Sequence, residues 1–227
     1  MALCGVVFLT AFAWREVPSL SAEDGLQPKL PDPHQITEAN FISTVNRLEI
    51  DFGGSSGYSL GEREISWLLQ AEADLKLRGI QVLGETKRLR MIASSYLNHR
   101  EYGRAFDFFS RVGDACGIEM SVWLLGHIHL TPPYTVLAQE YPGPIPPCNS
   151  EETRLETPHY RFVAYLKGPV YRYDKTLNTH SILWVSDDRQ IWGKVFLWSD
   201  PWIEWGLNDG RRCRFHTQTH QLETETE

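Results

Sequence analysis

The sequence lacks the patterns that mark common catalytic and structural metal sites. Its four cysteines, Cys4, Cys116, Cys148 and Cys213, form no Cys-x-x-Cys pair, and this spacing argues against a structural zinc site. It contains no Gly-x-Ser-x-Gly nucleophile motif and no Asn-x-Ser/Thr glycosylation signal. The residue patterns therefore predict no catalytic residue and no cofactor.

Positive charge is also scarce. Lys and Arg number 22 against 29 Asp and Glu, which leaves a net charge of −7. A general basic field, the usual mark of nonspecific nucleic-acid binding, is therefore absent.

Long apolar runs are missing as well. The apolar segment 3–14 has twelve residues, whereas a membrane-spanning helix needs about 20. The segment could be the core of a signal peptide, with Ser19-Leu20-Ser21 as a small-x-small cleavage site. No Lys or Arg precedes it, and its removal would leave three cysteines, an odd number for a secreted domain. A strand or helix that docks onto the core is the alternative.

Aromatic residues, by contrast, are plentiful. Eight Trp, nine Tyr and ten Phe are enough for a substantial buried core. Composition along the chain predicts three parts: an apolar segment and proline-rich arm at 1–35, a single globular domain at 36–215, and an acidic disordered tail at 216–227.

The first half of the domain shows one strand-like and three helix-like segments. Loose alternation over 41–52 predicts a strand. A helix is expected over 60–77 behind a Ser59-x-x-Glu62 capping box, followed by an amphipathic helix over 85–98 and a shorter one over 105–112.

The second half is expected to be rich in β-structure. Alternation over 118–130 predicts a half-exposed strand, and six prolines make 131–147 a long exposed loop. Further strands are predicted at 160–173, 181–185 and 191–197, the last two joined as a hairpin by 186–190. The predicted fold class is α+β, with helices packed on one face of a mostly antiparallel sheet.

The best metal candidates are His127 and His129, because residues two apart on a strand share a face. The third ligand would come from a donor elsewhere, and the possible ones are His159, His180, Glu119 and Glu140. The alternative is that both histidines are simply polar residues on a wet strand face. A metal-dependent enzyme of an unmarked family therefore remains an alternative.

Two local basic groups stand out on this acidic chain. They are Lys87, Arg88 and Arg90 in the second predicted helix, and Arg211, Arg212 and Arg214 near the end. Such groups could bind an anionic membrane surface or nucleic-acid phosphates. They could equally be solvated faces balanced by neighbouring acids.

Two further groups are candidates for partner binding. Pro132, Pro133 and Tyr134 resemble short extended peptides that aromatic grooves recognise. Trp198, Trp202 and Trp205 belong to a tryptophan-rich sheet end that could bind a glycan or a protein partner, or fill the core. The first group could also be a plain loop.

Two segments resemble the rhabdovirus matrix proteins. They are 41–97 (FISTVNRLEIDF…GYSLGEREISWLLQ…LRG…KRLRMIASSYL) and 160–173 (YRFVAYLKGPVYRY). In that family a strand leads through a polar turn into a helix, a glycine break and a second apolar helix. The present chain departs from the family in its apolar N-terminus, its acidity and the internal position of Pro132-Pro133-Tyr134.

The resemblance implies a non-enzymatic assembly protein that self-associates, binds the inner face of an envelope membrane and condenses a nucleocapsid. It would lie in the virion, or in the host cytoplasm and at the inner membrane face, with host proteins as further partners of the proline-rich loop. The alternative is a secreted or anchored binding module that uses the tryptophan-rich surface.

Overall fold

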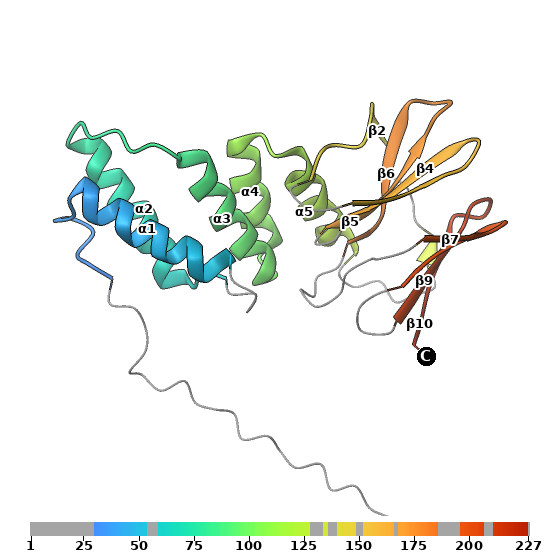
Figure 1. The fold of residues 1–227 in the computed structure, drawn as a ribbon, viewed down its shortest axis with the longest axis horizontal. Helices are drawn as coiled ribbons and strands as arrows, with labels where there is room; N and C mark the ends of the chain where they lie inside the picture. Colours follow the sequence, from blue (N-terminus) through green and yellow to red (C-terminus); the bar gives the residue numbers. More distant parts are fainter. Residues whose placement is uncertain are drawn as a thin grey trace, which may run out of the picture. The chain divides into compact units, whose positions relative to one another are not determined.

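The computed structural model describes residues 30–53, 59–127, 134–135, 140–148, 152–165, 168–185, 196–206 and 211–226. Residues Pro31–Glu227 form one compact unit. In the described part of this unit, five helices are followed by ten strands, most of them short (Figure 1). Almost all of the predicted apolar segment and proline-rich arm lies outside the described residues.

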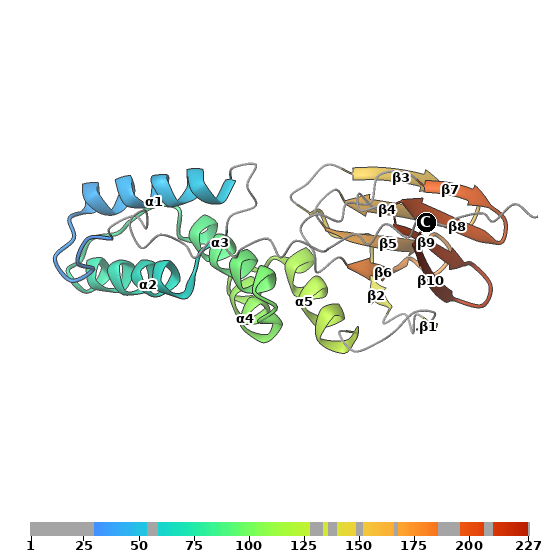
Figure 2. The same ribbon diagram turned by 90° about the horizontal axis from the view of Figure 1, so that it is seen from below.

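The first helix, α1 (Glu38–Gly53), corrects the prediction of a strand over 41–52. The side chains of Phe41, Thr44, Val45 and Leu48 are buried, and this spacing of three, one and three residues is helical. Helix α1 lies beside α2 (Glu62–Leu77), where the Phe41 ring stacks on Trp67 at 5.8 Å between centroids (Figure 2).

Helices α2, α3 (Glu85–Asn98) and α4 (Tyr102–Val112) occupy the three segments in which the sequence predicts helices. The capping contact of α2 is shifted, because the Gly61 amide donates to the Glu64 carboxylate at 3.1 Å. Helices α3 and α4 form a hairpin whose interior includes Ala93, Tyr96, Ala105 and Phe109.

Helix α5 (Ala115–His127) corrects the prediction of a strand over 118–130, of which 128–130 lie outside the described residues. The buried residues of α5 include Glu119, Ser121 and Leu124 rather than one alternate row of apolar side chains. Gly117 lets α5 approach α4 closely, since a Cβ atom there would lie 2.3 Å from Cδ1 of Phe109.

The strands form two five-stranded antiparallel sheets. Sheet I has the order β2-β6-β5-β4-β3 and contains β2 (Tyr141–Pro142), β3 (Glu152–Glu156), β4 (Tyr160–Tyr165), β5 (Pro169–Asp174) and β6 (Thr179–Val185). Sheet II has the order β1-β10-β9-β8-β7 and contains β1 (Tyr134–Thr135), β7 (Phe196–Ser199), β8 (Trp202–Gly206), β9 (Arg211–His216) and β10 (Gln221–Thr226).

Sheet I is covered on both faces. Phe162 and Leu183 pack with Trp205 and Phe215 of sheet II in one apolar cluster. A second cluster packs against the helices and is formed by Val163, Tyr165, Tyr171, Ile182, Val185, Tyr102 and Leu124. The α+β class and the helix-covered face are therefore confirmed, but the strands form a two-sheet sandwich rather than one sheet.

Two further predictions about the strands are wrong. Strands β6 and β7 belong to different sheets, so the described part of 191–197 forms no hairpin with 181–185. The expected disordered tail contains β10, which pairs with β9 from Leu222 opposite Phe215 to Thr226 opposite Arg211. Leu222 is fully buried, and β10 is stabilised by that burial and by its ladder of hydrogen bonds.

Candidate functional site

A proline-rich segment crosses the helix-facing side of sheet I. Residues 140–148, here called the proline strap, begin at β2, where Tyr141 pairs with His180 and Pro142 with Thr179 of β6. The strap ends at Cys148, which forms a disulfide with Cys116 of α5 over a Cα–Cα distance of 5.6 Å. The strap is therefore held to the sheet at one end and to a helix at the other.

Contacts along the strap fix its path. The Gly143 amide donates to the Asn178 carbonyl at 2.8 Å, and Gly143 has a φ of 86°, a left-handed conformation that favours glycine. The Tyr165 hydroxyl donates to the Pro146 carbonyl at 3.3 Å. Between these two points, Ile145 packs against the apolar cluster of the helix-facing side.

A buried polar cluster lies beneath the start of the strap. His180 Nε2 contacts the Glu119 carboxylate at 3.1 Å, and His180 Nδ1 contacts the Gly143 carbonyl at 2.9 Å. The Tyr171 hydroxyl donates to the same carboxylate at 3.0 Å, and the Tyr141 ring stacks on His180 at 5.4 Å. The cluster joins α5, β2, β5, β6 and the strap.

Both nitrogens of the His180 ring face acceptors, which suits the doubly protonated imidazolium. Burial acts to lower the pKa of His180, but the hydrogen bonds to Glu119 and Gly143 outweigh it and raise the pKa above its usual value. Burial and the neighbouring Glu119 raise the pKa of Tyr171, which stays protonated. The cluster is thus a satisfied ion pair that locks the helix to the sheet.

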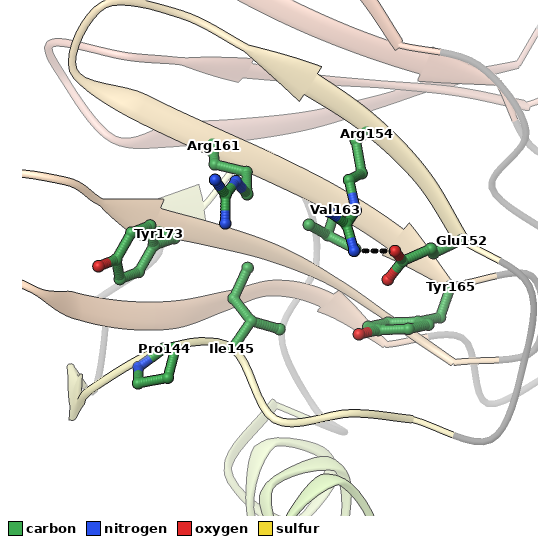
Figure 3. Close-up of a pocket in the computed structure, with 8 residues that line it drawn as sticks. All are labelled: Pro144, Ile145, Glu152, Arg154, Arg161, Val163, Tyr165 and Tyr173. Carbon is green, nitrogen blue, oxygen red and sulfur yellow. Dashed lines mark ion pairs between the residues drawn. The ribbon is translucent and has the colours of Figure 1, made fainter.

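A small pocket opens between the strap and strands β3 to β5. Figure 3 shows Ile145 pointing from the strap toward the sheet, between Arg161 and Tyr165. The pocket has a volume of about 80 Å³ and is completed by Pro144, Glu152, Arg154, Val163 and Tyr173. Sites for whole small molecules usually measure about 300 Å³ or more, so this one suits a side chain or a single functional group of a larger partner.

Two arginines give the pocket exchangeable donors. Arg154 forms an ion pair with Glu152, and Arg161 forms one with Glu156 and lies over the Tyr173 ring at 5.8 Å. The side chains of Arg154 and Arg161 are 56% and 41% exposed, respectively. Exposed pairs of this kind contribute about 1 kcal/mol at most, so a ligand that accepts hydrogen bonds can replace either glutamate.

Only part of the predicted basic group on α3 is exposed to solvent. Arg88 is buried and forms two 2.9 Å hydrogen bonds with Glu72, which corrects its assignment to membrane or nucleic-acid binding. Lys87 is exposed but pairs with Glu49, and Arg90 is less exposed and pairs with Asp114 at 3.0 Å.

The second basic group lies on β9 of sheet II. Arg214 pairs with Glu223 and Glu225 of β10, and its guanidinium lies over Trp202 at 4.7 Å. Arg212 is exposed and opposite Glu225, and Arg211 is half-buried and opposite Thr226. Acidic neighbours therefore neutralise part of this group, and its binding to anions stays a prediction.

The three candidate tryptophans have different environments. Trp205 is 1% exposed in the cluster between the sheets, which corrects its assignment to a partner surface. Trp202 is half-buried and packs edge-on against His216, whereas Trp198 is 47% exposed on β7. Only Trp198 presents a large part of its ring to a partner.

The remaining candidates are mostly not described. Pro132 and Pro133 lie outside the described residues, and Tyr134 begins β1. His129 is likewise outside, and His127 ends α5, where it stacks on Trp123 at 4.2 Å. The prediction that the two histidines share one face of a strand is therefore wrong, because His127 lies in a helix. Among the described residues, no three potential ligands gather around one point.

The comparisons give no relative. No protein-family model matches the chain, and no curated protein matches it significantly. None of the helices that the structure describes is both long and apolar enough to cross a bilayer. The strand at 41–52, one part of the resemblance to matrix proteins, is helix α1. The matrix-like role, its partners and its virion location stay predictions.

Sequence reasoning missed the strap site almost entirely. Glu119 and His180 appeared only as possible third ligands of a metal, and they contact each other instead. Cys116 and Cys148 are 32 residues apart, and this spacing does not indicate from the sequence that they form a disulfide. The one usable signal was the run of prolines ending in Cys148, because a segment without amide donors must find contacts outside a sheet ladder.

Proposed function

We propose that this chain is a non-enzymatic binding protein of an oxidising compartment, with the proline strap and its pocket as the contact surface. The disulfide between Cys116 and Cys148 carries the proposal, since it both shapes that surface and belongs to such compartments. The apolar segment 3–14 and the small-x-small Ser19-Leu20-Ser21 support export.

Binding fits the chemistry of this surface better than catalysis. The buried Glu119, His180 and Tyr171 satisfy one another, so they stabilise the fold rather than act on a ligand. The cationic groups that line the pocket are Arg154 and Arg161, whose present partners are weakly held glutamates. These guanidiniums offer fixed donors to a carbonyl or carboxylate.

Site-specific photo-crosslinking tests the proposal. A benzophenone amino acid at Arg154 should form a discrete adduct with a partner in the native host. The same group at Gln218, an exposed residue in the β9–β10 turn, serves as the control and should give none. No adduct at Arg154, or equal adducts at both positions, would contradict the proposed surface.

Peptide mapping without reductant tests the compartment. Protein isolated from the host with its thiols blocked at lysis should yield the 116–148 disulfide-linked peptide pair. Recovery of both cysteines as blocked thiols would remove the observation on which the proposal depends.

A further inference from the structure

The proline strap has the composition of a ligand rather than of a sheet strand. Four prolines, at 142, 144, 146 and 147, remove four amide donors from nine residues. After β2, the strap forms no strand in the described residues up to Cys148. Apart from the Gly143 amide, which donates to the Asn178 carbonyl, and the short β2 pairing, the described contacts of the strap come from carbonyl groups and side chains, as in extended proline-rich peptides.

Sheet I offers the complementary groups. Tyr165 donates its hydroxyl to the Pro146 carbonyl, and His180 contacts the Gly143 carbonyl. The rings of Tyr165 and Tyr171 meet edge to face at 6.2 Å. Ile145 packs against the cluster to which both belong, and Figure 3 shows it pointing toward the sheet near Tyr165. Aromatic walls with hydroxyl donors are the features by which proteins recognise proline-rich segments.

We propose that the helix-facing side of sheet I is a docking groove for an extended proline-rich peptide, which the strap occupies in cis and the Cys116–Cys148 disulfide locks. This inference rests on the proposed function, and it adds the class of partner and the means of control. The strap itself shows which chemistry the groove accepts, since four of its nine residues are proline.

Thiol exchange with a dithiol would unlock the groove. Cys148 is half-buried and Cys116 is buried, so a dithiol thiolate attacks Cys148 Sγ and expels the Cys116 thiolate, which takes up a proton. The second thiol of the reductant then attacks the mixed disulfide and releases Cys148 as a thiol. The protein gains two electrons and two protons, and the dithiol becomes a disulfide.

Fluorescence anisotropy with a strap peptide tests the inference. The probe is a fluorescein-labelled peptide of residues 140–147, and the control peptide has alanine in place of its four prolines. The full-length protein is measured oxidised, reduced with dithiothreitol, as C116S/C148S, and as Ile145→Ala with Pro146→Ala. The last variant keeps the disulfide but loosens the strap.

The reduced protein, C116S/C148S and the loosened-strap variant are the released forms. They should bind the probe roughly tenfold or more tightly than the oxidised wild type, because the locked strap competes with the probe at a high effective concentration. Adding Tyr165→Phe to a released form should weaken binding by roughly twofold to tenfold through loss of one hydrogen bond. The alanine peptide should bind none of them.

The inference fails if the reduced protein and the loosened-strap variant, both folded by circular dichroism, ignore the probe. It fails equally if they bind the alanine peptide as well as the probe, or if the oxidised protein binds the probe as tightly as they do. Should C116S/C148S not fold, those two forms still decide. A crosslink at Arg154 combined with no probe binding would leave the proposed function standing and remove only the proline-rich partner.

Discussion

The helical region and the junction between α5 and sheet I each contain a buried ion pair, but of different kinds. In the helices, Arg88 binds Glu72 through two nitrogens, donates to the Leu83 carbonyl at 2.6 Å and lies over Phe41 at 5.3 Å. At the junction, His180 binds Glu119 beside a disulfide. A guanidinium keeps its charge at every physiological pH, whereas an imidazolium does not.

The contacts of the helical region should therefore be permanent, whereas those of the junction should depend on conditions. Neither proton loss nor thiol exchange affects the Arg88 pair, so α1 to α3 should hold together under any ordinary condition. The junction depends on the protonation of His180 and on the oxidation of Cys116 and Cys148, so its contacts should weaken while the helices remain packed. Four measurements test this contrast.

Removal of Arg88 should have the largest effect. Arg88→Ala leaves the buried Glu72 carboxylate with only Lys76, 3.5 Å away, and removes the donor to the Leu83 carbonyl, so it should lower the free energy of unfolding by about 3–5 kcal/mol. Urea denaturation followed by tryptophan fluorescence measures the change. The matched control Lys87→Ala breaks an exposed pair and should lower it by less than about 1 kcal/mol. Equal losses in the two variants would show that the buried Arg88 pair stabilises the helices no more than the exposed Lys87 pair does.

Loss of the disulfide should come next. The bonded cysteines are 32 residues apart, and loop-closure entropy predicts a loss of roughly 3–4 kcal/mol in C116S/C148S. Hydrogen exchange locates the effect, which should appear in the strap and α5 and spare α1 and α2. Equal deprotection of α1 and α2 would mean that the two regions do not unlock separately.

A methyl group at Gly117 should disturb the contact of α5 with α4 and leave the charged and sulfur groups of the junction in place. Gly117→Ala places Cβ 2.3 Å from the Phe109 ring, and should lower the free energy of unfolding by about 1–3 kcal/mol through overpacking. Gly126→Ala is the control on the same helix, because nothing lies within 4 Å of its added Cβ. That change should be neutral or stabilising, as alanine is the better helix former. Thermal denaturation compares the two.

The smallest effect should be the pH dependence of His180. Because the folded pKa of His180 is raised, the pair contributes fully below the unfolded value of about 6.5. Its contribution is lost as the pH rises through the folded pKa. The groups facing His180 are Glu119 of α5, Tyr171 of β5 and Tyr141 of β2.

The stability difference between the wild type and His180→Gln should therefore shrink from acidic to alkaline pH. Urea denaturation across pH 5 to 9 gives the difference. Subtraction of the variant removes the contribution of His220, whose pKa is lowered by burial and by Arg172. A difference that grows with pH would mean that His180 is neutral when folded. It would contradict the claim that protonation of His180 stabilises the junction.

Local pattern predicted α2, α3 and α4 because the buried apolar residues of each helix recur at helical spacing. It failed for α1 and α5 for separate reasons. In α1, the apolar Ile50 lies exposed, and counting it as core produced a false alternation. In α5, the buried row includes Glu119 and Ser121, which are inside because Tyr171, His180 and the Gly117 carbonyl supply their hydrogen bonds.

Much of the site was beyond sequence reasoning, because its partners are distant along the chain. Glu119 and His180 are 61 residues apart and Tyr165 and Pro146 are 19 apart, and no periodicity reports such contacts. The tryptophan cluster shows the same limit. Trp205 and Trp198 lie in neighbouring strands of one sheet, yet one fills the core and the other faces solvent.

The sequence by itself determined the α+β composition, three of the helices and a proline-rich segment that could not continue a sheet, because propensity and amide donors are properties of single residues and their near neighbours. Only the tertiary structure decided that the strands divide into two sheets, that Cys148 meets Cys116 and that the prolines lie on a tyrosine-lined face. Those outcomes follow from which surfaces bury one another, a choice made between segments far apart in the chain.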